Sequence, residues 1–357
     1  MSVQLRVVLD QASQVVDVDQ ARAALSLTAG LVATAPRGCV VSALVPRGAE
    51  VSVRGVRDVR TLPLGRSELA ATWQMGIAPG VGGGLIHAPG LMAPLVRHDR
   101  THDNHQIVVT LWDLRAWESP GSLPKGQVAW QRAMLKRAVR HADAVVVPSH
   151  AVGQRLGEIA RLGDRVRVVA GAAPDGFEVP RDADRRREDL QIPERYVVLT
   201  GEGDSLAAGF RAAARAGLDA VVLDAAEGSE PALADAAAAA GLPERRAHIR
   251  GLLAEADRAS VLGGAAAMVA TSEQAGWPWR AVEAMTLGIP VVAGDSGVHR
   301  DVIADGGAVV DAAELEDALV DALGAGEKRL RVLASDRARA FSWASSAERV
   351  WALHAEL

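Results

Sequence analysis

The chain has 357 residues, a formal net charge of −5 and a single cysteine, Cys39. This length exceeds one ordinary hydrophobic core and predicts two domains. The acidic balance argues against a nucleic-acid binder, which would normally be basic, and one cysteine excludes a disulfide framework or a thiolate metal site. No apolar run approaches the roughly 20 residues that a membrane span needs, and the first residues lack a signal-peptide pattern. We therefore expect a cytoplasmic protein.

Short apolar runs alternate with helical patterns along the first half of the chain. Strand-like runs occupy residues 5–9, 39–44, 107–114, 142–149 and 166–169, and helical patterns occupy 21–31 and 128–141. Such alternation predicts βαβ units around a parallel sheet.

The second half repeats this alternation after a charged interruption. Residues 180–194 are rich in charge and lack apolar periodicity, which is typical of an inter-domain linker. Strand-like runs follow at 196–201, 221–224, 248–252, 267–270 and 290–293, with helical patterns at 233–240, 255–262 and 279–287. A second α/β domain is therefore predicted.

The stretch 270–311 combines the features of a ligand site. A loop containing Gly276 leads into a helix that ends at Gly288, and a buried strand and a second glycine-bearing loop follow. Ligands of open α/β sheets bind outside the carboxyl ends of the strands. On the helix, Glu283 lies one turn after Arg280; the two form either a surface ion pair or part of a site that faces an open crevice.

This stretch resembles the donor-site segment of the retaining GT-B glycosyltransferases of the mannosyltransferase and glycogen-synthase-like superfamily, family 4 type. The matching residues are Glu283-Ala284-Met285, Gly288-Ile289-Pro290-Val291-Val292 and Gly307-Ala308-Val309-Val310-Asp311. Blocks in the same order cover nearly the whole chain. The resemblance implies a GT-B fold, an α/β pair of Rossmann-like domains facing across a cleft. The acceptor domain would span 1–178, completed by a helix at 342–357, with a linker at 179–194 and the donor domain at 195–341.

The resemblance also implies a function. Such an enzyme moves a hexose, mannose or similar, from a UDP- or GDP-linked sugar to a glycan or lipid-linked acceptor with retention, and it needs no cofactor and no metal. The implied donor-binding residues are Glu283 on the ribose, Arg280, Arg300 and His299 near the diphosphate, and Gly201 and Gly276 in the adjoining loops. The implied catalytic residues on the acceptor side are His87 and Asp113.

Four departures from the superfamily pattern fall on this implied site. Leu206 and Ala207 stand where the superfamily has an Arg and a Lys that bind the diphosphate, and Ala275 replaces the first Glu. Trp112 replaces a histidine, and residues 17–20 replace a glycine-rich loop. Our second hypothesis is therefore a catalytically inactive GT-B homologue that binds or scaffolds a partner glycosyltransferase subunit.

Three further features have two interpretations each. His87 contacts a sugar hydroxyl or is a buried histidine satisfied by the backbone. The basic side of the helix 128–141 is a solvated face or a peripheral contact with the inner face of the membrane. Three histidines, at 98, 102 and 105, invite a metal site, but the charged residues around them indicate a solvated loop.

Overall fold

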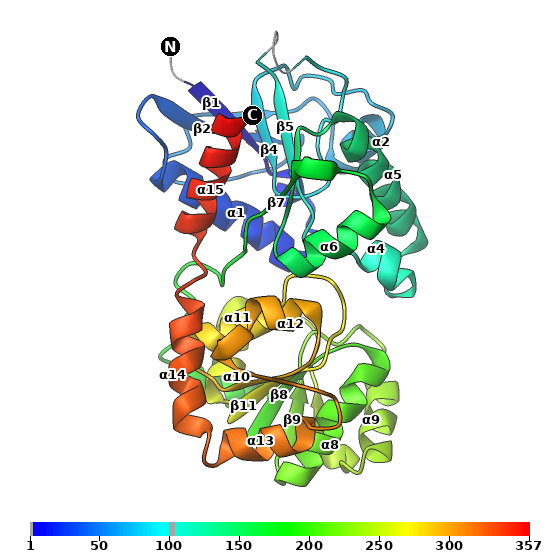
Figure 1. Cartoon of the computed structure of the whole chain (residues 1–357), viewed down its shortest axis with the longest axis vertical. Helices are drawn as coiled ribbons and strands as arrows, with labels where there is room; N and C mark the ends of the chain where they lie inside the picture. The colour runs from blue at the N-terminus through cyan, green and yellow to red at the C-terminus, as the bar shows by residue number, and fades with distance from the viewer. Residues whose placement is uncertain (1–2, 100–103) are drawn as a thin grey trace. The chain divides into compact units, whose positions relative to one another are not determined.

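The computed structural model describes residues 3–99 and 104–357 and divides into two compact units. The first unit contains residues 1–174, 274–277 and 341–357, and the second contains 175–273 and 278–340. Each unit has its own parallel sheet with helices on its faces, as Figure 1 shows. The alternation of strands and helices predicted from the sequence is confirmed.

The sheet of the first unit has the order β3-β2-β1-β4-β5-β6-β7 within the described residues. Its strands are β1 (Val3–Val8), β2 (Cys39–Val45), β3 (Val59–Thr61), β4 (Leu85–Ala88), β5 (Gln106–Thr110), β6 (Ala144–Val147) and β7 (Val166–Val168). Its helices are α1 (Val18–Ala33), α2 (Arg66–Gln74), α4 (Arg115–Glu118), α5 (Lys125–His141), α6 (His150–Ile159) and α15 (Trp343–Glu356). The strand order reverses between β1 and β4, so a ligand site is expected at the carboxyl ends of these two strands.

The sheet of the second unit has the order β10-β9-β8-β11-β12-β13. Its strands are β8 (Tyr196–Thr200), β9 (Asp219–Val222), β10 (Ala247–Ile249), β11 (Ala267–Ala270), β12 (Val291–Gly294) and β13 (Ala308–Val310). Its helices are α7 (Ala183–Asp189), α8 (Leu206–Ala216), α9 (Glu230–Ala239), α10 (Glu255–Gly264), α11 (Trp279–Thr286), α12 (Gly297–Val302), α13 (Leu315–Leu323) and α14 (Glu327–Ala338). Here the order reverses between β8 and β11.

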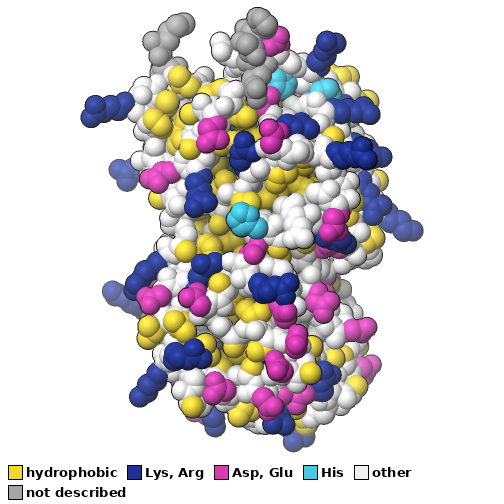
Figure 2. Space-filling view, viewed as in Figure 1, with side chains coloured by type: hydrophobic (Ala, Val, Ile, Leu, Met, Phe, Trp, Pro, Cys, Tyr) yellow, Lys and Arg dark blue, Asp and Glu magenta, His cyan; other side chains and the backbone are white. Residues whose placement is uncertain are grey.

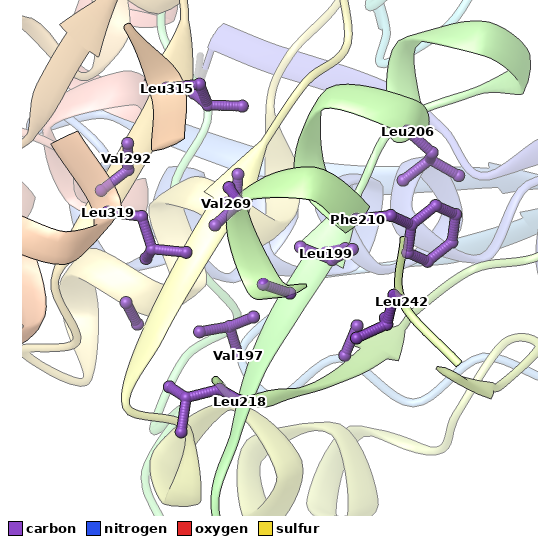
Figure 3. Packing of buried hydrophobic residues seen from close by; sticks show 14 of the residues in the cluster. Val197, Leu199, Leu206, Phe210, Leu218, Leu242, Val269, Val292, Leu315 and Leu319 are labelled. Atoms are coloured by element: carbon purple, nitrogen blue, oxygen red, sulfur yellow. The ribbon is translucent and has the colours of Figure 1, made fainter. Parts of the chain in front are cut away.

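The core of the second unit explains why its strands read as unbroken apolar runs. Leu199 of β8, Val269 of β11 and Val292 of β12 are fully buried. They pack against Phe210 of α8 and Leu319 of α13, as Figure 3 shows. Because helices cover the sheet, each central strand is apolar at consecutive positions instead of alternating.

The prediction of a linker at 179–194 is wrong. This segment belongs to the second unit and forms α7, which packs on α10. Arg186 pairs with Asp257 at 2.8 Å, and the Arg187 guanidinium donates to the Ser260 carbonyl at 3.0 Å. The charged residues that suggested a linker are therefore partly engaged in holding a short helix to its neighbour.

Side chains of both signs are interspersed over the second unit on the face shown in Figure 2. Among the helices that the structure describes, none has the length and apolarity to cross a membrane.

On α5, two of the basic residues bind main-chain carbonyls: Arg132 donates to Ala116 at 2.9 Å and Arg137 to Leu95. Peripheral membrane contact through α5 stays a prediction.

Helix α15 returns to the first unit and packs along α1 (Figure 1). The Trp351 indole donates to the Leu31 carbonyl at 3.1 Å. A Cβ atom at Gly30 would lie 2.6 Å from the Trp343 carbonyl oxygen. The close approach of the two helices therefore depends on glycine at position 30.

Gly30→Ala is expected to destabilise the first unit by about 1–3 kcal/mol, because the added methyl group must push backbone away. A matched control is Gly157→Ala in α6, where a Cβ would meet nothing within 4 Å. That change should stabilise the unit by up to about 1 kcal/mol through helix propensity. Urea unfolding followed by circular dichroism compares the two, and equal effects would contradict the packing argument.

Candidate functional site

The carboxyl edge of the second sheet places Gly201 beside the point where the strand order reverses. Gly201 follows β8, and Thr271 follows the adjacent strand β11. A Cβ at Gly201 would lie only 2.2 Å from the Thr271 hydroxyl oxygen and 2.9 Å from that of Ser205. Glycine is therefore required here by packing between two loops, and its predicted contact with a donor stays a prediction.

Helix α11 carries a buried network of charges. Arg258 of α10 binds both carboxylate oxygens of Glu283, at 2.9 and 2.8 Å. Arg280 reaches the same carboxylate at 3.0 Å and binds Asp224, in the loop after β9, at 2.7 Å. The side chains of Arg258, Glu283 and Arg280 are only 4%, 2% and 5% exposed. The two arginines and two carboxylates together compensate each other's charge.

This network corrects the expectation that Glu283 faces an open crevice. The predicted pairing of Arg280 with Glu283 is present, but the pair is buried rather than solvated. The guanidinium of Arg258 covers the carboxylate and binds both of its oxygens. Such bidentate pairs are strong, and the sequence did not reveal this one. Ribose binding by Glu283 stays a prediction, and it would require the hydroxyls to share an acceptor already used by two arginines.

The two residues that open α12 have different environments. His299 is buried, and its Nδ1 lies 2.8 Å from the Gly294 carbonyl oxygen. Burial lowers the pKa of His299, so the ring is neutral at physiological pH. Arg300 is exposed and pairs with Asp295. Only Arg300 of this pair offers a cation on the surface, and its contact with a diphosphate stays a prediction.

The loop 274–277 belongs to the first unit, although the donor domain was expected to contain it. Gly276 pairs with Asp113 in an isolated antiparallel bridge. The main chain of Ala275 is bonded on both sides, accepting from Leu114 and donating to Glu118, each at 2.9 Å. The structure therefore places Gly276 in the first unit, and its predicted contact with a donor stays a prediction.

His87 is fully buried in β4 and is not among the residues that line the cavity of the first unit described below. Its ring stacks edge-on against His354 of α15 at 5.7 Å between centroids. Within the described residues neither ring nitrogen of His87 has a hydrogen-bond partner. Burial and the neighbouring His354 hold the pKa of His87 well below its usual range. The prediction of a sugar contact is wrong for this structure, and the expected backbone partner is absent too.

Two of the three histidines predicted to lie in a solvated loop, His98 and His105, have buried side chains instead. His98 lies 2.9 Å from the Asp143 carboxylate, and its ring stacks on that of His105. His102 lies outside the described residues. Within the part of the chain that the structure describes, no group of three or more His, Cys, Asp or Glu side chains is arranged to hold a metal ion.

A cavity of about 480 Å³ opens where the strand order of the first sheet reverses. It is lined by Asp10, Gln11, Val16, Asp17, Gln20, Arg66, Ser67, Ala70, Gly90, Leu91, Met92, Thr110, Leu111, Trp112, Asp113, Gly126, Gln127, Trp130 and Gln131. The loops after β1, β4 and β5 all contribute to it. Asp113 was predicted as a site residue, and the structure places it here.

Two ion-pair groups hold the cavity wall together. Arg66 binds Asp10 through Nε and Nη2 at 3.1 and 3.0 Å. Arg115 donates from Nη2 to both Asp17, at 2.8 Å, and Asp113, at 3.0 Å. Burial raises the pKa of Asp10 and of Asp17, although the neighbouring arginines oppose this shift. Perturbed carboxyl groups in a cavity are a common mark of a functional site.

Sequence reasoning missed most of this cavity. Asp17 and Gln20 were seen only as replacements for a glycine-rich loop, and Asp10 and Arg66 were not considered. One signal was available, since Asp10 follows the first predicted strand almost directly. The partner Arg66 comes from α2, and no local pattern links it to Asp10.

Residues 206–325 match the family described as "Glycosyl transferases group 1". None of the curated proteins matches the chain in sequence. Apart from residues 274–277, the family match lies in the second unit. It agrees with the superfamily that the sequence resembles, but it tests neither the mannose specificity nor the family 4 type.

Solved structures similar to the chain share its fold along nearly their whole length. HepE of Anabaena, solved with UDP and glucose, has 16% identity and a TM-score of 0.66, covering 99% of this chain and 100% of its own. Sucrose-phosphate synthase from Thermosynechococcus elongatus has 18% identity and a TM-score of 0.65, covering 99% and 98%. WaaG, a glycosyltransferase involved in lipopolysaccharide biosynthesis, has 14% identity and a TM-score of 0.60, covering 97% and 98%. These identities show the fold alone, and the predicted GT-B fold class is confirmed.

Proposed function

We propose that the chain is a glycosyltransferase that takes its sugar from a nucleotide-sugar donor. The observation that carries this proposal is the family match over residues 206–325, since a fold alone does not define a reaction. The matched residues include α11 and α12, and therefore Arg280, Glu283, His299 and Arg300. The donor would bind at the carboxyl edge of the second sheet, where the strand order reverses.

A UDP-linked donor is the form we propose. HepE of Anabaena has been solved with UDP and with UDP-glucose, and it resembles this chain over nearly its whole length. The transfer of a hexose with retention to a glycan or lipid-linked acceptor, without a metal, remains part of the proposal on the strength of the sequence resemblance.

The chemistry requires positive charge near the departing diphosphate, because negative charge grows there as the glycosidic bond breaks. Arg280, in the first turn of α11, is the cation we assign to this role. Its guanidinium already binds Asp224 and Glu283. Asp224 is the more exposed partner, with 34% of its side chain accessible. We therefore propose that donor binding exchanges Asp224 for a phosphate oxygen on Arg280.

Asp224→Asn is expected to raise the affinity for UDP about threefold or more. A carboxylate about 5 Å from a phosphate costs up to roughly 3 kcal/mol at an effective dielectric of 20. The matched control is Asp219→Asn at the opposite edge of the same sheet, where Asp219 accepts from Arg246 at 2.8 Å. Calorimetric titration with UDP compares the two, and the control should leave the affinity unchanged.

Turnover is tested by UDP release from a panel of UDP-linked sugars with and without added glycans. We expect release in the wild type and its loss in Arg280→Gln. Failure of UDP, GDP and their sugars to bind any form of the chain would overturn the proposal and favour the inactive homologue that binds a partner subunit.

A further inference from the structure

The arginines at the cavity of the first unit are already paired with carboxylates of the protein. Among the described residues that line it, Arg66 is the only cation, and two of its nitrogens bind Asp10. Arg115, just behind the wall, donates to Asp17 and Asp113. An anionic ligand would find both guanidinium groups already paired.

The same wall presents negative charge to a ligand. Three carboxylates line the cavity, from Asp10, Asp17 and Asp113. The side chains of Asp17 and Asp113 remain 22% and 14% exposed. Like charges in a partly desolvated site repel, so a phosphate or carboxylate on the ligand would be disfavoured.

The polar groups of the wall suit hydroxyl groups instead. Carboxylates accept hydrogen bonds from hydroxyls, and amide side chains both donate and accept. The cavity contains four glutamines, Gln11, Gln20, Gln127 and Gln131, beside the carboxylates. The Gln20 amide nitrogen donates to Asp113 at 3.1 Å, which orients that carboxylate. The arrangement offers several hydrogen-bond partners without net positive charge.

Two tryptophans are among the apolar residues of the wall. The indole N–H of Trp130 donates to the Ala70 carbonyl at 3.1 Å, and that of Trp112 donates to Pro89 at 2.9 Å. Trp112 is only 4% exposed, whereas Trp130 is half-buried, so Trp130 is the tryptophan whose ring carbon a ligand can reach. Ring carbon packs well against the C–H face of a sugar. The volume of about 480 Å³ lies within the usual range of small-molecule sites.

We propose that this cavity binds an uncharged, hydroxyl-rich sugar and discriminates against phosphorylated and carboxylated sugars. The proposal rests on the proposed function in one respect, namely that this sugar would be the acceptor. Asp10 is the specificity-determining residue, because it neutralises Arg66, the cation that would otherwise hold a phosphate.

Saturation-transfer difference NMR on the full chain, without nucleotide, tests the binding preference. The probes are methyl α-glucoside, methyl α-mannoside and maltose, with glucose 6-phosphate, mannose 6-phosphate and glucuronate as charged counterparts. We expect at least one neutral sugar to bind about tenfold or more tightly than its charged counterpart. Equal or tighter binding of the charged sugars, or no binding of any neutral sugar, would overturn the proposal.

Asp10→Asn gives a gain-of-binding test, and a gain cannot arise from misfolding. Without the carboxylate, Arg66 becomes available, so affinity for the 6-phosphates should rise about tenfold. The matched control is Glu158→Gln on α6, which removes an exposed partner of Arg155 and does not line the cavity. Unchanged phosphate binding in Asp10→Asn would show that Asp10 does not set the preference.

The two proposals fail separately. Binding of a neutral sugar by a chain that ignores UDP supports this inference and contradicts the proposed function. Binding of UDP by a chain that binds no neutral sugar contradicts this inference and supports the proposed function.

Discussion

Glu283→Ala is expected to destabilise the second unit by about 3–5 kcal/mol, because it leaves buried Arg258 without a carboxylate and Arg280 with Asp224 alone. Arg258 and Arg280 are 4% and 5% exposed and would lose the carboxylate that compensates them. Leaving one member of a buried ion pair uncompensated costs far more than the net contribution of the intact pair.

Hydrogen exchange of the α10 and α11 amides in increasing urea measures this loss within the unit concerned. The control is Glu327→Ala, which removes an exposed partner that Arg331 contacts at 3.0 Å. That change should cost less than about 1 kcal/mol. An apolar triple variant, Arg258→Met, Glu283→Leu and Arg280→Met, should recover much of the loss, since buried ion pairs are often replaceable by apolar packing. Equal effects of the Glu283 and Glu327 variants would contradict the buried network.

The expected loss of stability makes Glu283→Ala a poor test of the donor site. A loss of nucleotide binding in Glu283→Ala would report the unfolding of α11 as readily as the loss of a ribose contact. Asp224 avoids the difficulty because it is partly exposed and its proposed effect is a gain. The donor site is therefore better tested at Asp224 than at Glu283.

The sequence predicted the fold well because the fold depends on local patterns. The run 290–293 between two breakers became β12, and the helical pattern ending at Gly288 became α11. Gly288 itself has φ of +67°, the left-handed conformation that terminates helices. Each of these signals lies within a few residues, so one sequence is sufficient to read them.

The site was predicted less well because its partners come from distant segments. Glu283 was identified on α11, but Arg258, which covers it, lies on α10. The spacing of Arg280 and Glu283 indicated an ion pair and gave no information on its burial. The sequence indicated no side-chain partner for His87, because its neighbour His354 lies on the last helix. Tertiary contacts of this kind have no periodicity or motif to reveal them.

The charged segment at 180–194 was wrongly predicted to be a linker. Its composition suggested a linker, yet Arg187 and Arg186 bind groups on α10. A short helix with many charged side chains cannot be told from a linker by composition, since only its few buried contacts distinguish the two.

The paired histidines of the first unit predict a loss of stability in acid. Burial lowers the pKa of His354 to about 4, and burial with His354 nearby holds the pKa of His87 well below its usual range. The unfolded chain binds these protons at a pKa near 6.5, whereas the folded chain excludes them. Acid therefore favours unfolding, and His354 alone should cost about 3 kcal/mol between pH 6.5 and pH 4.

Urea unfolding at several pH values measures this loss in the wild type and in His354→Leu. The variant should lose less stability across the window, by about 1.4 kcal/mol per pH unit. His150→Leu, at an exposed site on α6, is the matched control and should retain the wild-type slope. Parallel profiles for the wild type and His354→Leu would contradict the exclusion of a proton from the buried ring.

The wild type must be compared with His354→Leu because two carboxyl groups of the same unit have the opposite effect on stability in acid. Burial raises the pKa of Asp10 and of Asp17 in the folded chain. The folded state then takes up these protons before the unfolded state does, so acid adds stability as the pH falls through the raised values. The wild-type profile contains both effects. Only the difference between the wild type and the histidine variant isolates the destabilising one, and its sign must be a smaller acid loss in the variant.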